Sequence, residues 1–203
     1  MSAEFIPVWR AVTPELAKEL IDFWRDTGAI ADEAAAKQRV QQVVCVARDG
    51  EGKLCGVGTA IIKVIPRLRQ PMYYYRQFFA KTLRGKHQEL AFFQRCKQVL
   101  QEYNTALAQT ESLGILLEIE NEKIAVAYKQ AVIPGFDAVF IGYSPRGLQL
   151  RVSYFDNAEL KQPVRPRTLP AAAQGIQIAR RGTNPPLSGT AMLSGSITTE
   201  KVP

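Results

Sequence analysis

Residues 115–136 read ILLEIENEKIAVAYKQAVIPGF, and this stretch decides the predicted fold. Its first five residues, Ile115–Ile119, are mostly apolar and predict a strand. The pair Glu120-Asn121 then interrupts the apolar pattern. A helix is predicted next, because apolar residues recur with the i, i+3, i+4, i+7 spacing of one helical face: Ile124, Ala127, Tyr128 and Ala131. The pair Pro134-Gly135 ends that helix.

The residues upstream predict two helices and an antiparallel meander. Thr13 and Pro14 suit the N-cap and the first position of a helix. The turn Asp49-Gly50-Glu51-Gly52 separates two β-prone runs, which predicts a hairpin. In chain order, strands are predicted at 6–10, 43–48, 54–65 and 71–80, and helices at 14–26, 32–42 and 86–108.

Downstream of the quoted stretch, strands are predicted at 138–143 and 148–155, on either side of the turn Ser144-Pro145-Arg146-Gly147. The whole order, with helices and strands interspersed along the chain, predicts an α/β (α+β) protein. From Glu159 onward, six prolines and the lack of an amphipathic period predict an irregular C-terminal tail. The expected organisation is one folded domain over 1–158 and a Pro/Gly/Ser-rich basic tail over 159–203.

Composition bears on the compartment and on the partners. No apolar run approaches the ~20 residues of a membrane span, and the N-terminus lacks a secretory pattern, so a cytoplasmic protein without membrane contact is expected. The net charge is +7, but residues 159–203 supply +4 of it, which leaves no strong case for nucleic acid. The three scattered cysteines suit buried, reduced side chains, and a single histidine argues against a metal site.

This layout resembles the fold of the Gcn5-related N-acetyltransferases (GNAT), and the resemblance implies a mixed, mostly antiparallel central sheet flanked by helices. The likeness rests on the strand, the Glu120-Asn121 break, the helix with Tyr128 and the Gly135-Phe136 pair, and the element order agrees over about residues 5–156. It implies acetyl-coenzyme A, or another acyl-coenzyme A, as co-substrate. It also implies direct attack by an amine, and a small amine or amino-acid-like acceptor is expected. A homodimer is compatible with the resemblance.

The resemblance further implies a phosphate-binding loop between the fourth strand and the next helix. The family pattern is Arg/Gln-x-x-Gly-x-Gly/Ala, whose backbone N–H groups face the pyrophosphate together with the helix N-terminus. This chain departs from the pattern, because His87 and Glu89 stand where glycine or alanine is expected. The implied cofactor-binding residues are Phe79 or Ala80 at the thioester, Arg84, Gly85, Lys86, His87, Gln88 and Glu89 at the pyrophosphate, and Asn121.

Both departures matter, because His87 adds bulk where the pyrophosphate should approach and Glu89 adds a carboxylate near two phosphate charges. At ~4 Å and an effective dielectric of ~20, like charges repel by on the order of 4 kcal/mol. Arg84, Lys86 and Arg95 would offset part of that repulsion, or the carboxylate would turn away. If no phosphate binds, Glu89 is simply a favourable acid in the first turn of a helix.

Three residues are implied as catalytic by the resemblance. Tyr128 would protonate the departing thiolate, although its position also suits a core aromatic on an amphipathic helix. Glu118 and Glu120 are the candidate general bases. They alternate with Ile119, so both are expected on one face of their strand. A solvated Glu120 at the strand end is the alternative.

Two clusters in the fourth strand and its turn have two interpretations each. The aromatic residues of 73–79 would line an acyl or acceptor pocket, or they would serve sheet packing. Arg67, Arg69 and Arg76 would favour an anionic substrate, or they would form a solvated hairpin end.

Three functions therefore stay open from the sequence. The first is a GNAT-like N-acyltransferase that moves an acyl group from acyl-coenzyme A to an amine. The second is a catalytically degenerate GNAT-fold protein for binding or assembly, which His87 and Glu89 favour. The third is an acyltransferase with a carrier-protein donor, whose phosphopantetheine lacks the nucleotide.

Overall fold

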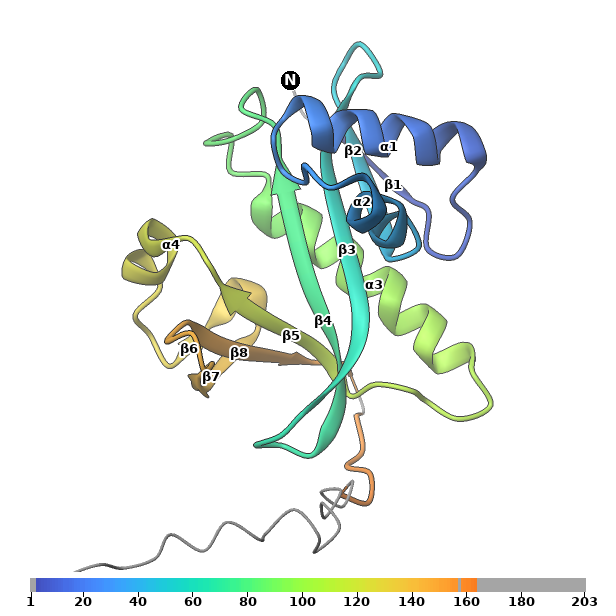
Figure 1. Cartoon of the computed structure of the whole chain (residues 1–203). Helices are drawn as coiled ribbons and strands as arrows, with labels where there is room; N and C mark the ends of the chain where they lie inside the picture. The colour runs from blue at the N-terminus through green and yellow to red at the C-terminus, as the bar shows by residue number, and fades with distance from the viewer. Residues whose placement is uncertain (1–2, 157, 164–203) are drawn as a thin grey trace, which may run out of the picture. The chain divides into compact units, whose positions relative to one another are not determined.

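The computed structural model of the chain describes residues 3–156 and 158–163 (Figure 1). The helices are α1 (Pro14–Asp26), α2 (Glu33–Val40), α3 (Glu89–Ala106) and α4 (Glu122–Ala127), with a 3-10 turn η1 (Pro134–Phe136). The strands are β1 (Glu4–Pro7), β2 (Val43–Arg48), β3 (Leu54–Ile65), β4 (Gln70–Phe79), β5 (Gly114–Ile119), β6 (Val132–Ile133), β7 (Ala138–Tyr143) and β8 (Gln149–Tyr154).

The described strands form one sheet in the order β1-β2-β3-β4-β5-β8-β7-β6. Every neighbouring pair is antiparallel except β4 and β5, which run parallel. This confirms the predicted mixed, mostly antiparallel sheet. The β4–β5 pairing ends at Tyr75–Leu117, although β4 continues to Phe79 and β5 to Ile119. Beyond that pair the two strands point apart and leave a V-shaped opening in the sheet (Figure 1).

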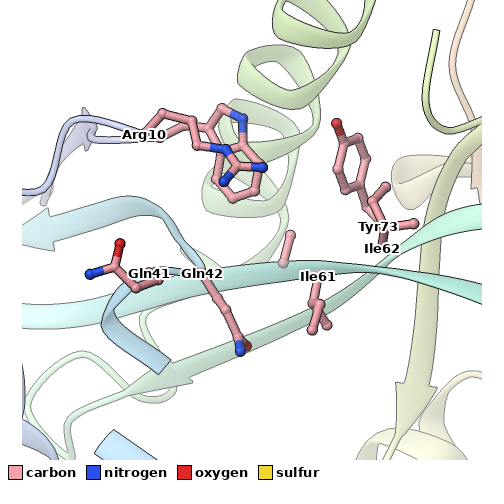
Figure 2. Close-up of a pocket in the computed structure, with 8 residues that line it drawn as sticks. Arg10, Gln41, Gln42, Ile61, Ile62 and Tyr73 are labelled. Atoms are coloured by element: carbon pink, nitrogen blue, oxygen red, sulfur yellow. The ribbon is translucent and has the colours of Figure 1, made fainter. Parts of the chain in front are cut away.

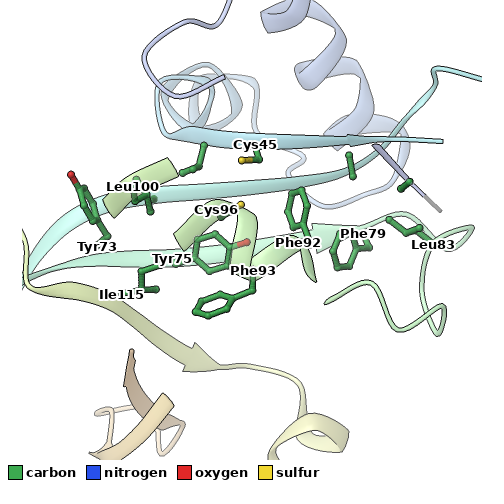
Figure 3. Close-up of a cluster of buried hydrophobic side chains, with 14 of the residues drawn as sticks. Cys45, Tyr73, Tyr75, Phe79, Leu83, Phe92, Phe93, Cys96, Leu100 and Ile115 are labelled. Atoms are coloured by element: carbon green, nitrogen blue, oxygen red, sulfur yellow. The ribbon is translucent and has the colours of Figure 1, made fainter. Parts of the chain in front are cut away.

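The helix α3 covers one face of the sheet. Alternate side chains of β4 point toward it, and Tyr75 packs against Phe93 with ring centroids 5.6 Å apart (Figure 3). Tyr73 and Phe79 lie in the same core, so sheet packing accounts for these three aromatics. Full burial of a large aromatic or aliphatic side chain contributes about 1.5–3 kcal/mol. All three cysteines are buried and unbonded, as expected.

The helices α1 and α2 cover the opposite face. Leu20 and Trp24 of α1 pack with Val46 and Val57 of the sheet. The predicted cap of α1 is confirmed, because the side-chain oxygen of Thr13 accepts the Leu16 N–H at 3.3 Å. The predicted ranges 14–26, 43–48 and 54–65 agree residue for residue with α1, β2 and β3.

Two predicted boundaries are wrong for backbone reasons. The first strand ends at Pro7 rather than Arg10, which adopts a positive φ of 61°. The helix predicted from Lys86 begins at Glu89, because Gly85 (φ 76°) and His87 (φ 55°) lie outside the right-handed helical region. Apart from the helix after Asn121, the remaining predicted ends agree with the observed ones or differ from them by at most two residues.

The predicted helix after Asn121 is much shorter than its periodicity indicates. It ends at Ala127, and all six of its residues are at least partly exposed. Residues 128–131 are not helical, and Val132–Ile133 pair with β7 as a short strand. A buried arginine of β8, Arg151, binds the main-chain carbonyls of Tyr128 and Gln130, at 2.7 and 2.8 Å. Those contacts hold the segment in a non-helical conformation.

The start of the predicted tail lies against the domain. The main chain of Lys161 both donates to and accepts from the side-chain amide of Gln70, at 3.1 and 2.8 Å. Residues 164–203, where the rest of the predicted tail falls, lie outside the described part of the chain. Within residues 3–156 and 158–163, no helix has the length and apolarity to cross a membrane.

Candidate functional site

Main-chain groups at the end of β4 face the V-shaped opening. The Ala80 N–H donates to the carbonyl of Cys55 in β3 at 2.9 Å. Because residues of an antiparallel pair alternate in hydrogen-bond direction, the N–H and C=O of Phe79 turn away from β3, toward β5. Phe79 and Ala80 were the two predicted thioester contacts. The Ala80 N–H is therefore bonded within the sheet, and the Phe79 N–H faces the V. The Phe79 carbonyl accepts from Arg84 Nε at 2.8 Å.

The predicted phosphate loop joins β4 to α3. Leu83 is buried and anchors it, and its N–H and that of Arg84 donate to the carbonyl of Ala80. Gly85 and His87 both have positive φ, so the backbone reverses direction just before α3. Among the described residues, the Gln88 side chain at the N-cap makes no capping bond. The first N–H groups of α3 thus have no side-chain cap, a geometry that suits an oxyanion.

Glu118 lies at the vertex of the V on the α1/α2 face. Its carboxylate accepts from Tyr74 Oη at 2.5 Å and pairs with Arg146 at 2.8 Å, and its side chain is 9% exposed. Burial raises the pKa of Glu118, but hydrogen bonds from Arg146, Tyr74 and Ser144 outweigh it and lower the pKa to about 2. So acidic a carboxyl is a weak proton acceptor, which argues against Glu118 as the general base.

Glu120 and Asn121 lie at the open end of β5. Glu120 is exposed and pairs with the same Arg146 nitrogen at 2.9 Å, so both carboxylates lie on one face, as the alternation with Ile119 predicts. The Asn121 side-chain oxygen caps α4 by accepting the N–H groups of Lys123 and Ile124, at 2.9 and 3.4 Å. Asn121 was predicted to bind the cofactor, and this capping role occupies its side-chain oxygen.

Tyr128 lies on the other side of the sheet, at the C-cap of α4. Its ring packs edge-on against Phe136 at 5.9 Å, and Phe136 in turn packs on Phe93 of α3. The side chain is half-buried, and its hydroxyl makes no hydrogen bond with the described residues. The carboxylates and the tyrosine therefore lie on opposite faces of the sheet.

Two further residues of the site, Arg146 and Arg151, were not assigned a role from the sequence. Tyr74 and Arg76, for which the sequence left two interpretations each, alternate along β4 on the face of Glu118. Arg146 was recognised only as part of a hairpin turn. Arg151 offers no sequence signal, because an arginine in a strand normally points to water.

A separate cavity of about 270 Å³ lies near Trp9, away from the predicted site residues (Figure 2). Arg10, Gln41, Gln42, Ile61, Ile62 and Tyr73 are among its lining residues. Within the described chain, the Trp9 indole N–H is buried without an acceptor.

The Glu118→Gln variant is expected to lose the pH dependence that this carboxylate confers. The folded pKa of about 2 is below the ordinary value of 4.5, so the carboxylate stabilises the fold above pH 4.5 and loses that effect as the pH falls toward 2. Screening through the exposed Arg146 limits the effect to about 1–2 kcal/mol. Urea unfolding measures the free energy of unfolding, which should be higher for the wild type than for the variant at pH 7. The two values should converge near pH 2. Glu122→Gln, at an exposed position, is the control. If the difference in unfolding free energy between the wild type and Glu118→Gln does not depend on pH, the low pKa of Glu118 is contradicted.

Comparison with known proteins gives structural likeness alone. No protein-family model matches the chain, and no curated protein matches it significantly. A GNAT acetyltransferase structure from Streptococcus pneumoniae matches with a TM-score of 0.51 and 12% identity, over 75% of this chain and 98% of that one. A phosphinothricin acetyltransferase from Sinorhizobium meliloti, in complex with AcCoA, matches with a TM-score of 0.49 and 14% identity, over 81% and 94%. A structure from Corynebacterium glutamicum, described as histone acetyltransferase HPA2 and related acetyltransferase, matches with a TM-score of 0.47 and 18% identity. The match covers 83% of this chain and 100% of that one.

The match to the Streptococcus pneumoniae structure concerns the same fold whose sheet is described above. The strand order, the single parallel β4–β5 pair and the V that opens after it are features of the sheet itself. At 12% identity the likeness concerns the fold. The chain has the fold of the GNAT acetyltransferases.

Proposed function

We propose that this protein is an N-acyltransferase that moves an acetyl or other acyl group from acyl-coenzyme A to an amine by direct attack. The observation that carries the proposal is the V between β4 and β5. The Phe79 N–H faces the V from β4. The loop of residues 80–88 then leads to the N-terminus of α3, which has no side-chain cap. This arrangement suits a thioester at the vertex and a pyrophosphate at the loop.

The loop residues fit the diphosphate of coenzyme A in part. Its backbone around Gly85 and His87 and the first turn of α3 would supply N–H donors, and Arg84 and Lys86 would supply positive charge. Glu89 opposes binding, because its carboxylate lies in the same first turn. We therefore expect binding that is real but weakened by Glu89.

The acyl-coenzyme A co-substrate would supply the activated thioester. The Phe79 N–H would stabilise negative charge on the carbonyl oxygen as the amine nitrogen attacks. Tyr128 would donate its proton to the sulfur as the carbon–sulfur bond breaks. The proton lost by the amine would pass to Glu120 or to water, since the pKa of Glu118 is too low for that role.

Calorimetric titration of the full chain with acetyl-coenzyme A tests this proposal. Micromolar binding is expected, and Glu89→Gln should tighten it by roughly tenfold because one like charge is removed. Glu102→Gln, which removes the same charge farther along α3, should leave the affinity unchanged. If millimolar acetyl-coenzyme A gives neither heat nor a thermal shift, the coenzyme A proposal fails.

Acyl transfer from a carrier protein is the second candidate, and Glu89 is the observation that favours it. A phosphopantetheine donor has no adenine nucleotide and only one phosphate, so an acid in the loop would cost less. Transfer from acetyl-pantetheine, without detectable binding of acetyl-coenzyme A, would support this candidate over the first.

A further inference from the structure

Cationic side chains gather around the ring of Tyr74 on the α1/α2 face of the sheet. The Lys63 ammonium lies 3.8 Å from the ring centroid, and the Arg76 guanidinium carbon lies 4.7 Å from it. Arg76 Nη2 also donates to Tyr74 Oη at 3.1 Å. Arg39 of α2 adds a third charge. Burial lowers the pKa of Arg39, and the charge of the nearby Arg76 lowers it further. We call Arg39, Lys63 and Arg76 the cationic cluster.

No carboxylate of the described chain pairs with the cationic cluster. The ion pairs formed by residues 3–156 and 158–163 include none of its three members. The neighbouring carboxylates of Glu118 and Glu120 are both bound to Arg146. Burial and repulsion from Arg76 also lower the pKa of Lys63. The cluster thus has an excess of positive charge, which the charges of Glu118 and Glu120 offset in part through space but which no direct ion pair neutralises in the described chain.

Arg76 itself has unused hydrogen-bonding capacity. It is half-buried, and the bond to Tyr74 is the single hydrogen bond of its side chain within the described chain. Its Nε–H is buried and has no acceptor there. A guanidinium offers five N–H donors in a planar fork that matches an oxyanion, and leaving a buried donor unpaired is costly.

The position of Arg76 says where such an oxyanion would lie. Arg76 and Glu118 are the residues that directly follow the last β4–β5 pair, Tyr75–Leu117, so they flank the vertex of the V. Tyr128 lies on the opposite face of the sheet, where it packs on Phe136. A group bound at Arg76 would therefore lie beside the vertex, on the side away from the tyrosine.

We infer that the cationic cluster binds an oxyanion, a carboxylate or a phosphate, carried by the amine acceptor. The inference of an oxyanion site stands on the cluster, and its attribution to the acceptor rests on the proposed function. The acceptor would then be an amino-acid-like or phosphorylated amine rather than a polyamine, which the excess positive charge would repel.

Nuclear magnetic resonance of the arginine Nε–H groups tests the site on the full chain without coenzyme A. Sodium acetate and inorganic phosphate are titrated separately at constant ionic strength, and the Arg76 signal is assigned by its loss in Arg76→Gln. A saturable shift of this signal is expected with at least one anion, and the anion that binds distinguishes carboxylate from phosphate. The Arg84 signal reports separately on phosphate in the loop.

Two variants make the titration decisive. Lys63 is exposed, so Lys63→Gln should fold normally and should weaken anion binding roughly tenfold or more. Arg69→Gln removes the same charge at another exposed position, in the turn before β4, and should change the affinity by less than about twofold. If neither anion moves the Arg76 signal saturably, or if the two variants weaken binding equally, the site is overturned.

An activity comparison tests the attribution to the acceptor. Glycine is compared with methylamine, and phosphoethanolamine with ethanolamine, since the members of each pair differ by the anionic group. With acetyl-coenzyme A as donor, the anionic member of at least one pair should have the higher kcat/KM, and Lys63→Gln should raise its KM. Acetylation without such a preference would overturn the inference and leave the proposed function standing. Absence of acetyl-coenzyme A binding would count against the proposed function alone, because the resonance titration does not need it.

Discussion

Replacing Arg151 with Met is expected to lower the free energy of unfolding by about 3 kcal/mol or more. Arg151 is 1% exposed, and its guanidinium donates to the carbonyls of Tyr128 and Gln130 and to the side chain of Gln149. The Met side chain keeps much of the volume but leaves those partly buried acceptors without their donor. Urea unfolding followed by circular dichroism measures the change.

The control for this experiment is an arginine that makes only exposed contacts. Arg25 pairs with Asp22 on α1, and its side chain is 64% exposed, so Arg25→Met should cost less than about 1 kcal/mol. Arg151→Lys should recover little, because an ammonium lacks the planar fork that reaches several carbonyls at once. A loss below about 1 kcal/mol in Arg151→Met would show that the segment after α4 is held in another way.

Replacing Tyr128 with Phe is expected to lower kcat by about 10²–10⁴-fold, if Tyr128 supplies the proton to the leaving thiolate. The hydroxyl makes no hydrogen bond within the described residues, so its removal should leave the unfolding free energy unchanged. That separation makes the variant a test of chemistry rather than of folding. Thiol release from acetyl-coenzyme A, measured with the first amine found to be acetylated, gives kcat.

Tyr143→Phe is the matched control, because Tyr143 is a 61% exposed tyrosine on β7. It should keep wild-type kcat. If kcat of Tyr128→Phe stays within about threefold of wild type while acetyl-coenzyme A still binds, Tyr128 is a packing residue and another group, or water, protonates the thiolate.

Local signals predicted most of the framework correctly. The Thr13 cap and the two turns that begin at Asp49 and Ser144 act within a few residues of chain, so nearby residues suffice to specify them. The strands that they separate carry β-prone side chains, and their ends were predicted within a few residues. The order of elements then supported the family resemblance, and the resemblance implied the mixed, mostly antiparallel sheet.

The predicted site fared less well, because its chemistry depends on partners distant in sequence. Glu118 looked like a base until Arg146, 28 residues on, and Tyr74 of β4 were seen to bind its carboxylate. Ala80 looked like a free donor until Cys55 of β3 was seen to accept its N–H. The roles predicted for Tyr128 and for the phosphate loop stay predictions.

The sequence by itself determined the succession of strands, helices and turns, because those depend on periodicity, capping and turn residues within short windows. The tertiary structure alone decided the length of α4, since Arg151 takes the carbonyls of the segment that follows it. It also decided which charges are neutralised and which remain in excess around Tyr74. Hydrogen bonds and ion pairs of this kind join atoms that only the folded sheet brings together.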